Sequence, residues 1–380
     1  MACDTHDIAR DRFMLTGGLA NQGYDWWWHS FTGHSEKTGE ERSFFIEFFC
    51  INPALGKKAP VFGQLPLNKE LGTWPSYVMV KCGTWGKDAR QIHRFFGWDE
   101  VEVGTGTPFY VQADDCFVCE TDLIGEVNVS EQAAQAHPEW MCDGGQMIWD
   151  LHMDKQIPFN VGYGASTPMR SSEVFEMYWH AEGMKTAYDG FVIYNGERFR
   201  VDPATCYGYA DKNWGRDFTS PWVWLSSNNL VSNRTGKRLE KSAFEIGGGR
   251  PKVGPLALDR KLLGSIVYEG TPYEFNFSKP WTGSTTHFEC HETQEEVVWR
   301  VELETFNAFL KVDTSCPKDE MLLINYEAPN GDKKHNRLWN GGTGTGRVEL
   351  YGKRGGSFFL IDDIAARNIG CEYGVYDEDL

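Results

Sequence analysis

Residues 207–224 read Tyr-Gly-Tyr-Ala-Asp-Lys-Asn-Trp-Gly-Arg-Asp-Phe-Thr-Ser-Pro-Trp-Val-Trp, and they combine many aromatic rings with charged and amide side chains. In an extended strand, side chains alternate between two faces, so Lys212 and Trp214 share one face. The other face carries Tyr209, Asp211 and Asn213. Because buried polar groups need partners, this mixture is typical of an aromatic-walled pocket that presents a few polar groups to an apolar ligand.

Strand-like runs recur outward from this segment in both directions. β-Branched and aromatic runs separated by Gly, Pro, Asn and Asp include 43–51, 76–81, 108–112, 190–194 and 297–303. Asn195-Gly196 between two such runs predicts a hairpin, because both positions accept positive φ. Helical periodicity is confined to residues 131–140 and 256–263. We therefore expect an all-β chain of antiparallel barrels or sandwiches with few short helices.

The length of the chain favours two units. At 380 residues, with 41% hydrophobic and 14% aromatic residues, the chain has ample material for a core, and two domains or one large double-layered β domain are expected. The best candidate for a linker is 245–255, which holds four glycines and two prolines. We place an N-terminal β domain at 1–248 and a C-terminal β domain at 255–380.

The net charge of −17 argues against several partners. No basic stripe is available for nucleic acid or for an anionic membrane surface. The longest apolar run, 43–51, contains Glu47 and is too short to span a bilayer. The N-terminus has no secretory pattern, so the ten cysteines are expected to be reduced and the protein cytoplasmic. The sequence leaves oligomerisation open.

Motifs for the common catalytic schemes are absent. There is no Gly-x-Ser-x-Gly elbow, no dinucleotide fingerprint and no P-loop. His287, Glu289 and His291 share a strand face in a way that metal ligands can, but a solvated acidic strand face is the favoured interpretation. Cys116 and Cys119 are interpreted as packing residues. We expect neither a metal nor another cofactor.

Two further segments alternate in the same way. Tyr178 and His180 lie on one face of the upstream run, with Glu176 and Glu182. Downstream, one face holds Trp222, Trp224, Ser226 and Asn228. One interpretation makes these strands a pocket wall with Tyr, His, Lys or Asp as acid or base. The other is a sheet core with satisfied polar groups, and spacing alone leaves both open.

The region 191–230 resembles the tocopherol cyclase family. The resemblance rests on Asn-Gly-Glu-Arg-Phe (195–199), Asp-Lys-Asn-Trp-Gly (211–215), Trp-Val-Trp (222–224) and Asn228. Blocks at 43–53, 261–275 and 342–346 agree in order, so the likeness covers most of the chain. The Asn-Trp-Gly region is also similar to the carotenoid hydratases and to a wider two-domain, lipocalin-like group that includes fungal Diels–Alder-type cyclases.

This resemblance implies two lipocalin-like units and a deep apolar cavity, with no metal or nucleotide. It implies an acid that protonates an alkene carbon and aromatic faces that stabilise cationic character. Trp214 is the strongest substrate-binding candidate that it indicates, followed by the pocket or scaffold residues Asn213, Trp222, Trp224 and Asn228; the alternation analysis adds Tyr209. The hydratases have a His where Lys212 stands, so the likeness favours the cyclases and the Lys212–Trp214 face.

The expected function is therefore a cofactor-independent cyclase or isomerase. It would close an oxygen heterocycle on a small, apolar phenolic substrate, prenylquinol-like or chalcone-like. Catalytic acid or base candidates are Tyr178, His180, Asp211 and Lys212. The alternatives are an alkene hydratase or dehydratase, a non-catalytic lipocalin-like carrier and, less favoured, Diels–Alder chemistry on a polyene.

Overall fold

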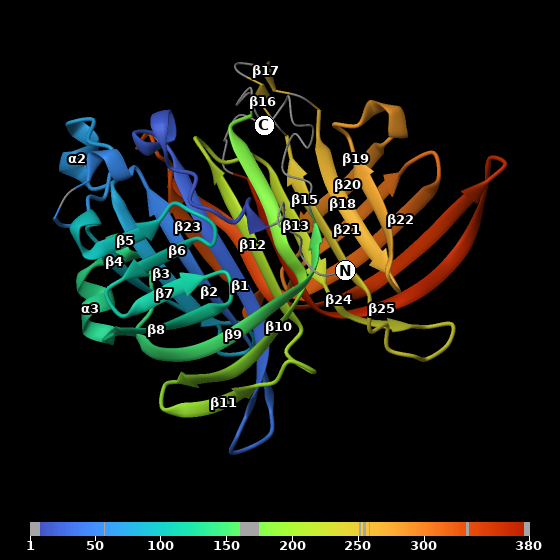
Figure 1. Cartoon of the computed structure of the whole chain (residues 1–380), viewed down its shortest axis with the longest axis horizontal. Coiled ribbons are helices and arrows are strands. Elements are labelled where there is room, and N and C mark those ends of the chain that lie inside the picture. Colours follow the sequence, from blue (N-terminus) through green and yellow to red (C-terminus); the bar gives the residue numbers. More distant parts are fainter. Residues whose placement is uncertain are drawn as a thin grey trace.

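Two large antiparallel sheets face each other in the computed structural model (Figure 1). The structure describes residues 8–56, 58–159, 175–250, 252–253, 256–257, 259–331 and 334–375. Within these ranges the α-helices are short, α2 (Pro66–Glu70) and α3 (Glu131–Ala136), and the other helical segments are single 3₁₀ turns. The expectation of an all-β chain with few short helices is confirmed.

The first sheet has twelve strands in the described residues and runs in the order β4-β3-β2-β1-β11-β10-β9-β8-β7-β6-β5. Strand β12 lies off this path and pairs with both β1 and β10. The strands are β1 (Tyr24–Ser35), β2 (Glu41–Ile51), β3 (Tyr77–Thr84), β4 (Arg90–Phe96), β5 (Val101–Gly104), β6 (Tyr110–Ala113), β7 (Cys116–Cys119), β8 (Asp122–Val129), β9 (Gly145–Phe159), β10 (Met177–Tyr194), β11 (Glu197–Val201) and β12 (Gly208–Gly215).

The second sheet has eleven strands in the described residues, in the order β19-β18-β15-β13-β25-β24-β22-β21-β20. Strand β14 pairs with β25, β23 pairs with β24, and β16 and β17 form a separate ribbon. The strands are β13 (Trp222–Ser227), β14 (Asn229–Ser232), β15 (Ala243–Gly249), β16 (Lys252–Val253), β17 (Leu256–Ala257), β18 (Lys261–Tyr268), β19 (Thr271–Asn276), β20 (Thr285–Glu292), β21 (Glu296–Glu304), β22 (Ala308–Pro317), β23 (Leu322–Glu327), β24 (Lys334–Arg354) and β25 (Ser357–Gly374).

Three apolar clusters make up the core. One lies inside the curve of the first sheet and includes Trp27 and Trp149, and another lies inside the second sheet around Trp299. The third joins the two sheets, because it contains Phe49 of β2 together with Trp224 of β13. The two units are therefore held together by a shared aromatic core rather than by a thin contact.

Local turn chemistry accounts for the hairpin predicted at Asn195-Gly196. Both residues have positive φ, 48° and 81°, and Tyr194 pairs with Glu197 across the turn. The helix predicted at 131–140 is present as α3 followed by a 3₁₀ turn, since Pro138 interrupts it. The helix predicted at 256–263 is wrong for the described residues there, because 256–257 form β17, 259–260 have no regular structure and 261–263 begin β18.

The chain passes from the first sheet to the second at 216–221, upstream of the Gly/Pro-rich stretch 245–255. Residues 222–249, which the sequence-based boundary assigns to the N-terminal domain, form β13 to β15 of the second sheet. The described glycines of that stretch permit close packing. A Cβ at Gly249 would lie 1.7 Å from the carbonyl oxygen of Pro221, and one at Gly247 would lie 3.2 Å from the Trp179 ring.

Trp85, directly after β3, connects the two sheets at another point. The indole of Trp85 donates a hydrogen bond to Asn340 Oδ1 over 2.8 Å, and a Cβ at Gly342 would lie 2.2 Å from the ring. Gly342 begins the second of two Gly-Thr-Gly-Thr segments. The first, at 104–107, contains Gly106, where a Cβ would meet nothing within 4 Å.

These two glycines give a matched test of the packing between the sheets. We expect Gly342→Ala to lower the free energy of unfolding by about 1–3 kcal/mol, because the methyl group collides with a buried ring that cannot move aside freely. Gly106→Ala is the control and should stay within about 0.5 kcal/mol of the wild type. Denaturant unfolding measures both; equal effects of the two substitutions would contradict the packing interpretation.

Candidate functional site

Two adjoining hollows lie between the sheets, each with a volume of about 20 Å³, room for about one water molecule. Their walls come from both sheets and share Trp26, Trp222, Tyr326 and Glu372. The first is completed by Met177, Phe218, Thr219 and Leu338, and the second by Trp28, Asp211, Asn213 and Trp224. An enclosure of aromatic rings with a few polar groups is the usual form of a small-molecule site. We call this pair of hollows the interdomain cavity.

Strand β12 divides the predicted site residues into two groups. Its register pairs Tyr178 with Trp214 and His180 with Lys212, so these four share one face, on which Lys212 Nζ contacts the Trp27 ring inside the first sheet's curve. The opposite face of β12 meets the second sheet and carries the other group: Tyr209, Asp211 and Asn213. The predicted alternation is confirmed. The cavity lies on the Asp211 side, whereas the sequence favoured the Lys212–Trp214 side.

Asp211 is the buried acid of the cavity wall. Its Oδ2 accepts hydrogen bonds from the Tyr209 hydroxyl at 2.8 Å and from the Trp179 indole at 3.0 Å, while Oδ1 has no hydrogen-bond partner. Burial raises the pKa of Asp211 to about 7 against the effect of these two donors. A carboxyl group with a pKa near neutrality can act as a general acid or base.

Glu372 is a second carboxyl group in the wall. It accepts hydrogen bonds of 2.6 Å from the Trp222 indole and from Asn340 Nδ2, and burial raises its pKa to about 7. Asn340 also accepts the bond from Trp85, so the carboxyl group is fixed through a chain of neutral donors. This chain ties the cavity to the contact that locks the two sheets.

Behind Tyr326, which lines both hollows, lies a buried ion pair. Lys81 Nζ lies 2.7 Å from Glu47 Oε2, with both side chains fully buried. The Tyr326 hydroxyl donates to the same oxygen over 3.0 Å, and Lys81 Nζ lies 4.0 Å from the centre of its ring. Burial lowers the pKa of Lys81 and raises the pKa of Glu47, and their mutual attraction opposes both shifts. Tyr326 therefore presents a hydroxyl with a strong acceptor behind it.

Asn228 and Asn213 have structural partners near the cavity. Asn228 Nδ2 donates to the carbonyl oxygens of Met184 and Gly208 over 3.0 and 2.8 Å, joining the start of the second sheet to the first. Asn213 Oδ1 accepts from the Tyr24 hydroxyl over 2.9 Å and lines the cavity.

The other face of β12 is closed by an ion pair. Lys212 bonds Asp25, both are fully buried, and Lys212 Nζ lies 3.6 Å from the Trp27 ring centre. Burial raises the pKa of Asp25 to about 6 and lowers that of Lys212, while the pair's attraction counters both changes. Trp214 stacks on Tyr178 with ring centres 5.6 Å apart. Neither hollow is lined by Lys212, His180, Tyr178 or Trp214.

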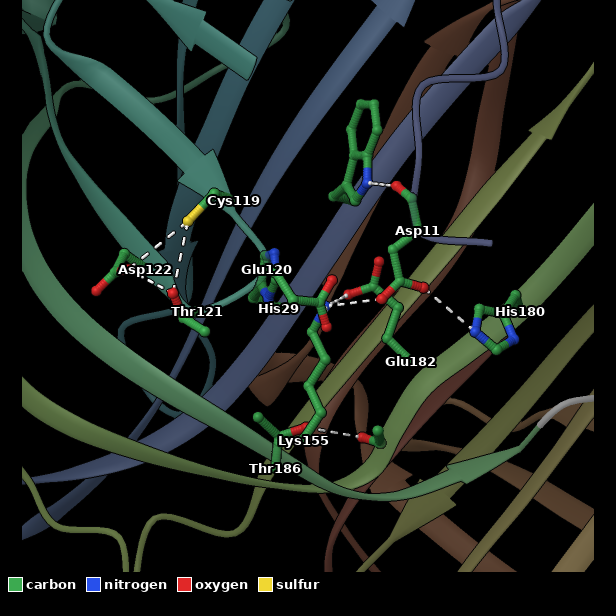
Figure 2. Close-up of polar contacts among 12 residues, drawn as sticks. Asp11, His29, Cys119, Glu120, Thr121, Asp122, Lys155, His180, Glu182 and Thr186 are labelled. Carbon is green, nitrogen blue, oxygen red and sulfur yellow. Dashed lines mark hydrogen bonds and ion pairs between the residues drawn. The ribbon is translucent and has the colours of Figure 1, made fainter. Parts of the chain in front are cut away.

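The space inside the curve of the first sheet is called the barrel interior here. Next to the Lys212–Asp25 pair, it contains a charge cluster around Lys155 (Figure 2). Lys155 Nζ lies 3.1 Å from Asp11, 3.1 Å from Glu120 and 2.8 Å from Glu182. His180 Nε2 lies 3.3 Å from Asp11 Oδ1. Burial would raise the pKa of Asp11, but Lys155 and His180 hold it below its ordinary value. Burial raises the pKa of Glu120 to about 8. The cluster anchors the N-terminal segment inside the barrel.

Sequence reasoning missed most of the ionisable residues around the cavity. Glu47 and Lys81 each interrupt an apolar run, and a charge in a strand that is otherwise all apolar is the signal that could have indicated a buried pair. Glu245, Glu372 and Tyr326 lie in later strands with no such contrast.

No metal site or membrane-spanning helix emerges from the described parts of the chain. No group of three His, Cys, Asp or Glu side chains there could hold a metal ion, and His287 and Glu289 lie exposed on β20 with 3.7 Å between them. No helix among the residues searched is both long and apolar enough to cross a bilayer.

Two solved structures were compared with the chain over nearly its whole length. A protein assigned as AttH from Nitrosomonas europaea superimposes with a TM-score of 0.51 at 12% identity, covering 99% of this chain and 98% of that one. Kievitone hydratase from Nectria haematococca gives a TM-score of 0.47 at 12% identity, covering 99% and 96%. No match was found among curated protein sequences. The fold is that of the two-unit, lipocalin-like β proteins.

The sequence model of the tocopherol cyclase-like family matches residues 149–374, which is more than half of the chain. The protein belongs to the tocopherol cyclase-like family, as the resemblance around Asn213–Gly215 indicated. The matched range runs from β9 to the end of β25 and includes Asp211, Trp222 and Glu372. Membership supports an enzyme of the cyclase type.

The Lys155 cluster predicts a large loss of stability on removal of its cation. We expect Lys155→Met to lower the free energy of unfolding by about 3–5 kcal/mol, because buried carboxylates are left without their counter-charge. Lys237→Met, at an exposed lysine, is the control and should change it by less than about 0.5 kcal/mol. Thermal and denaturant unfolding measure the difference, and similar values for the two variants would refute an anchoring role.

The raised pKa of Asp211 predicts how stability depends on pH. In the folded protein Asp211 keeps its proton up to about pH 7, whereas the same carboxyl group in the unfolded chain loses it near pH 3.8. The stability that the protonated Asp211 contributes is therefore present at low pH and is lost as the pH rises from about 3.8 to about 7. This loss should be absent in Asp211→Asn. The free energy of unfolding of the variant should therefore rise by a few kcal/mol relative to that of the wild type when the pH is raised from 4 to 8. Asp189→Asn, exposed on the same sheet, should follow the wild type. Parallel curves for Asp211→Asn and wild type would contradict the assignment.

Proposed function

We propose that the protein is a cofactor-independent cyclase that adds a phenolic oxygen across a carbon–carbon double bond in the interdomain cavity. Asp211 is the proposed acid, and it protonates the alkene carbon. The observation that carries the proposal is the placement of this buried carboxyl group, with a pKa near 7 and a free Oδ1, in a wall of tryptophans. Family membership supports the same chemistry.

The aromatic wall supports a cationic intermediate. Protonation of an alkene leaves positive charge on carbon, which the faces of Trp26, Trp28, Trp222 and Trp224 would stabilise by cation–π attraction. Glu372 and Asp211 add negative potential once ionised. Little water can enter such an apolar enclosure, which favours capture of the cation by the substrate's own oxygen over capture by water.

One tyrosine of the wall supports orientation of the phenol. Tyr326, with its hydroxyl bonded to Glu47, lines both hollows and shares the second one with Asp211. We assign it the binding of the substrate's phenolic group. The proton that the phenol loses on ring closure returns to Asp211, so the acid is regenerated and the reaction needs no net proton.

The size of the cavity favours a compact substrate. Each hollow has a volume of about 20 Å³, room for about one water molecule, so the surrounding rings must move apart to admit a substrate. A phenol with a short prenyl group or a chalcone-like skeleton needs a smaller displacement of these rings than a long prenyl chain. Tyr178, His180, Lys212 and Trp214 are assigned to holding β12 from its other face.

The test is conversion of a panel of short-chain prenylated hydroquinones and chalcone-type phenols, followed by liquid chromatography and mass spectrometry. We expect isomers of unchanged mass, and Asp211→Asn should reduce their rate of formation by about 10²–10⁴-fold, the usual contribution of a general acid. Asp189→Asn is the control and should retain wild-type turnover. Products heavier by one water would identify a hydratase, and absence of any turnover across the panel would exclude the proposed reaction.

A further inference from the structure

Behind Asp211, away from the cavity, lies a carboxyl group that the proposed reaction does not use. Glu245 is on β15, is fully buried and lines neither hollow. The Tyr209 hydroxyl contacts Glu245 Oε1 on one side and lies 2.8 Å from Asp211 Oδ2 on the other. The Trp224 indole lies 3.1 Å from Glu245 Oε1 and 3.2 Å from the Tyr209 oxygen. Two carboxyl groups from different sheets therefore meet at one hydroxyl.

Counting hydrogens shows that this arrangement holds an extra proton. The Tyr209 hydroxyl has one hydrogen and can donate to only one of the two carboxyl groups. The second contact is a hydrogen bond only if the other carboxyl group carries a proton and donates to the tyrosine oxygen. The two carboxyl groups are matched in their other contacts, because Asp211 Oδ2 accepts from Trp179, Glu245 Oε1 accepts from Trp224, and each group has one oxygen without a partner. Burial raises the pKa of Glu245 well above its ordinary value and that of Asp211 to about 7, so above about pH 7 the proton lies on Glu245 and Tyr209 donates towards the ionised Asp211.

We propose that Glu245 stores the proton that loads Asp211 and that Tyr209 conducts it. The inference rests on the proposed function, because Asp211 is the acid of that reaction. Glu245 and Tyr209 are positioning residues: neither touches the substrate, and both act by setting the protonation of Asp211.

The transfer is balanced in atoms and charge. The Tyr209 O–H bond breaks towards Asp211 as the Glu245 O–H bond breaks towards the tyrosine oxygen, which leaves Tyr209 neutral, Asp211 protonated and Glu245 ionised. Asp211 then gives its proton to the alkene carbon and later receives the phenolic proton. The reverse transfer returns that proton to Glu245, and one proton remains on the pair after each cycle.

The surroundings favour a single proton shared over the pair. Asp211 faces Glu372 of β25 and Glu47 of β2, and the latter is balanced by Lys81 of β3. Strands β13 and β18 place uncharged Ser226 and Ser265 beside Glu245 in the register. Burial and then the charge of Asp211 raise the pKa of Glu245 well above its ordinary value. A store of this kind keeps its proton at a pH where Asp211 alone has lost it.

The first test needs no substrate. Infrared spectra taken across a pH titration report the C=O stretch of protonated carboxyl groups. We expect the wild type to keep such a band into the alkaline range, and Glu245→Gln to remove the part of it that belongs to Glu245. Burial also raises the pKa of Glu182 well above its ordinary value, so Glu182→Gln, on the other side of the sheet, should remove a separate part of the band and leave the Glu245 part in place. An unchanged alkaline band in Glu245→Gln would overturn the proposal.

The second test is the pH profile of turnover. In Glu245→Gln the alkaline limb should move towards acid, so that the rate falls by about 10²-fold at pH 8 and recovers near the wild-type rate at pH 5. Tyr209→Phe keeps both carboxyl groups and the ring but breaks the transfer, so its alkaline limb should move in the same direction. A uniform loss at all pH values in both variants would mean that the residues are only structural, and would refute the proposal.

The two tests separate this inference from the proposed function. If the infrared component depends on Glu245 but no phenol is converted, the proton store is retained and the proposed reaction fails. If phenols are cyclised and Asp211→Asn abolishes this, but Glu245→Gln has the wild-type pH profile, the reaction is retained and the store fails.

Discussion

Strand β12 is buried on both faces, and much of the candidate site depends on this constraint. A strand at the surface can leave its charged side chains in water, but here each one must find a partner inside the protein. Lys212 therefore bonds Asp25 in the barrel, while Asp211 is held by Tyr209 and Trp179 on the side of the second sheet. The strand thus places buried polar groups on the side of each sheet. A shift of β12 would therefore change the geometry of both groups.

The ionisable groups on the two faces of β12 differ in how far opposite charges balance them. In the barrel, Lys155 stands among carboxylates and Lys212 opposes Asp25, so opposite charges balance in part. Around the cavity, Lys81 pairs with Glu47, but Asp211 and Glu372 have neutral donors as partners. Carboxyl groups bonded only to neutral donors keep a raised pKa when buried, which suits proton transfer. Ion pairs mainly hold structure in place.

Features that depend on local chemistry could be predicted from the sequence. The Asn195-Gly196 hairpin follows from two residues that accept positive φ, and the two faces of β12 follow from strand alternation. The family could be identified from the region around Trp214.

Features that depend on long-range packing could not be predicted. Which face of β12 meets a cavity is decided by where the second sheet packs, and no spacing within 207–224 contains that information. Tyr326 and Glu372 reach the site from strands more than 100 residues away. The run of glycines at 247–249 has the composition of a linker, yet it forms a strand because neighbouring backbone and rings approach too closely for side chains.

That run of glycines has a consequence for how substrate preference can evolve in this protein. Trp179 lies over Gly247 and also bonds Asp211, so the position of a wall residue is set from behind by the absence of a side chain. A single added methyl group there would displace the indole, and with it the acid, without altering any atom that a ligand touches. A substitution at Gly247 could therefore change ligand preference during evolution. A comparison of cavity-lining residues alone would not detect it, because Gly247 does not line the cavity.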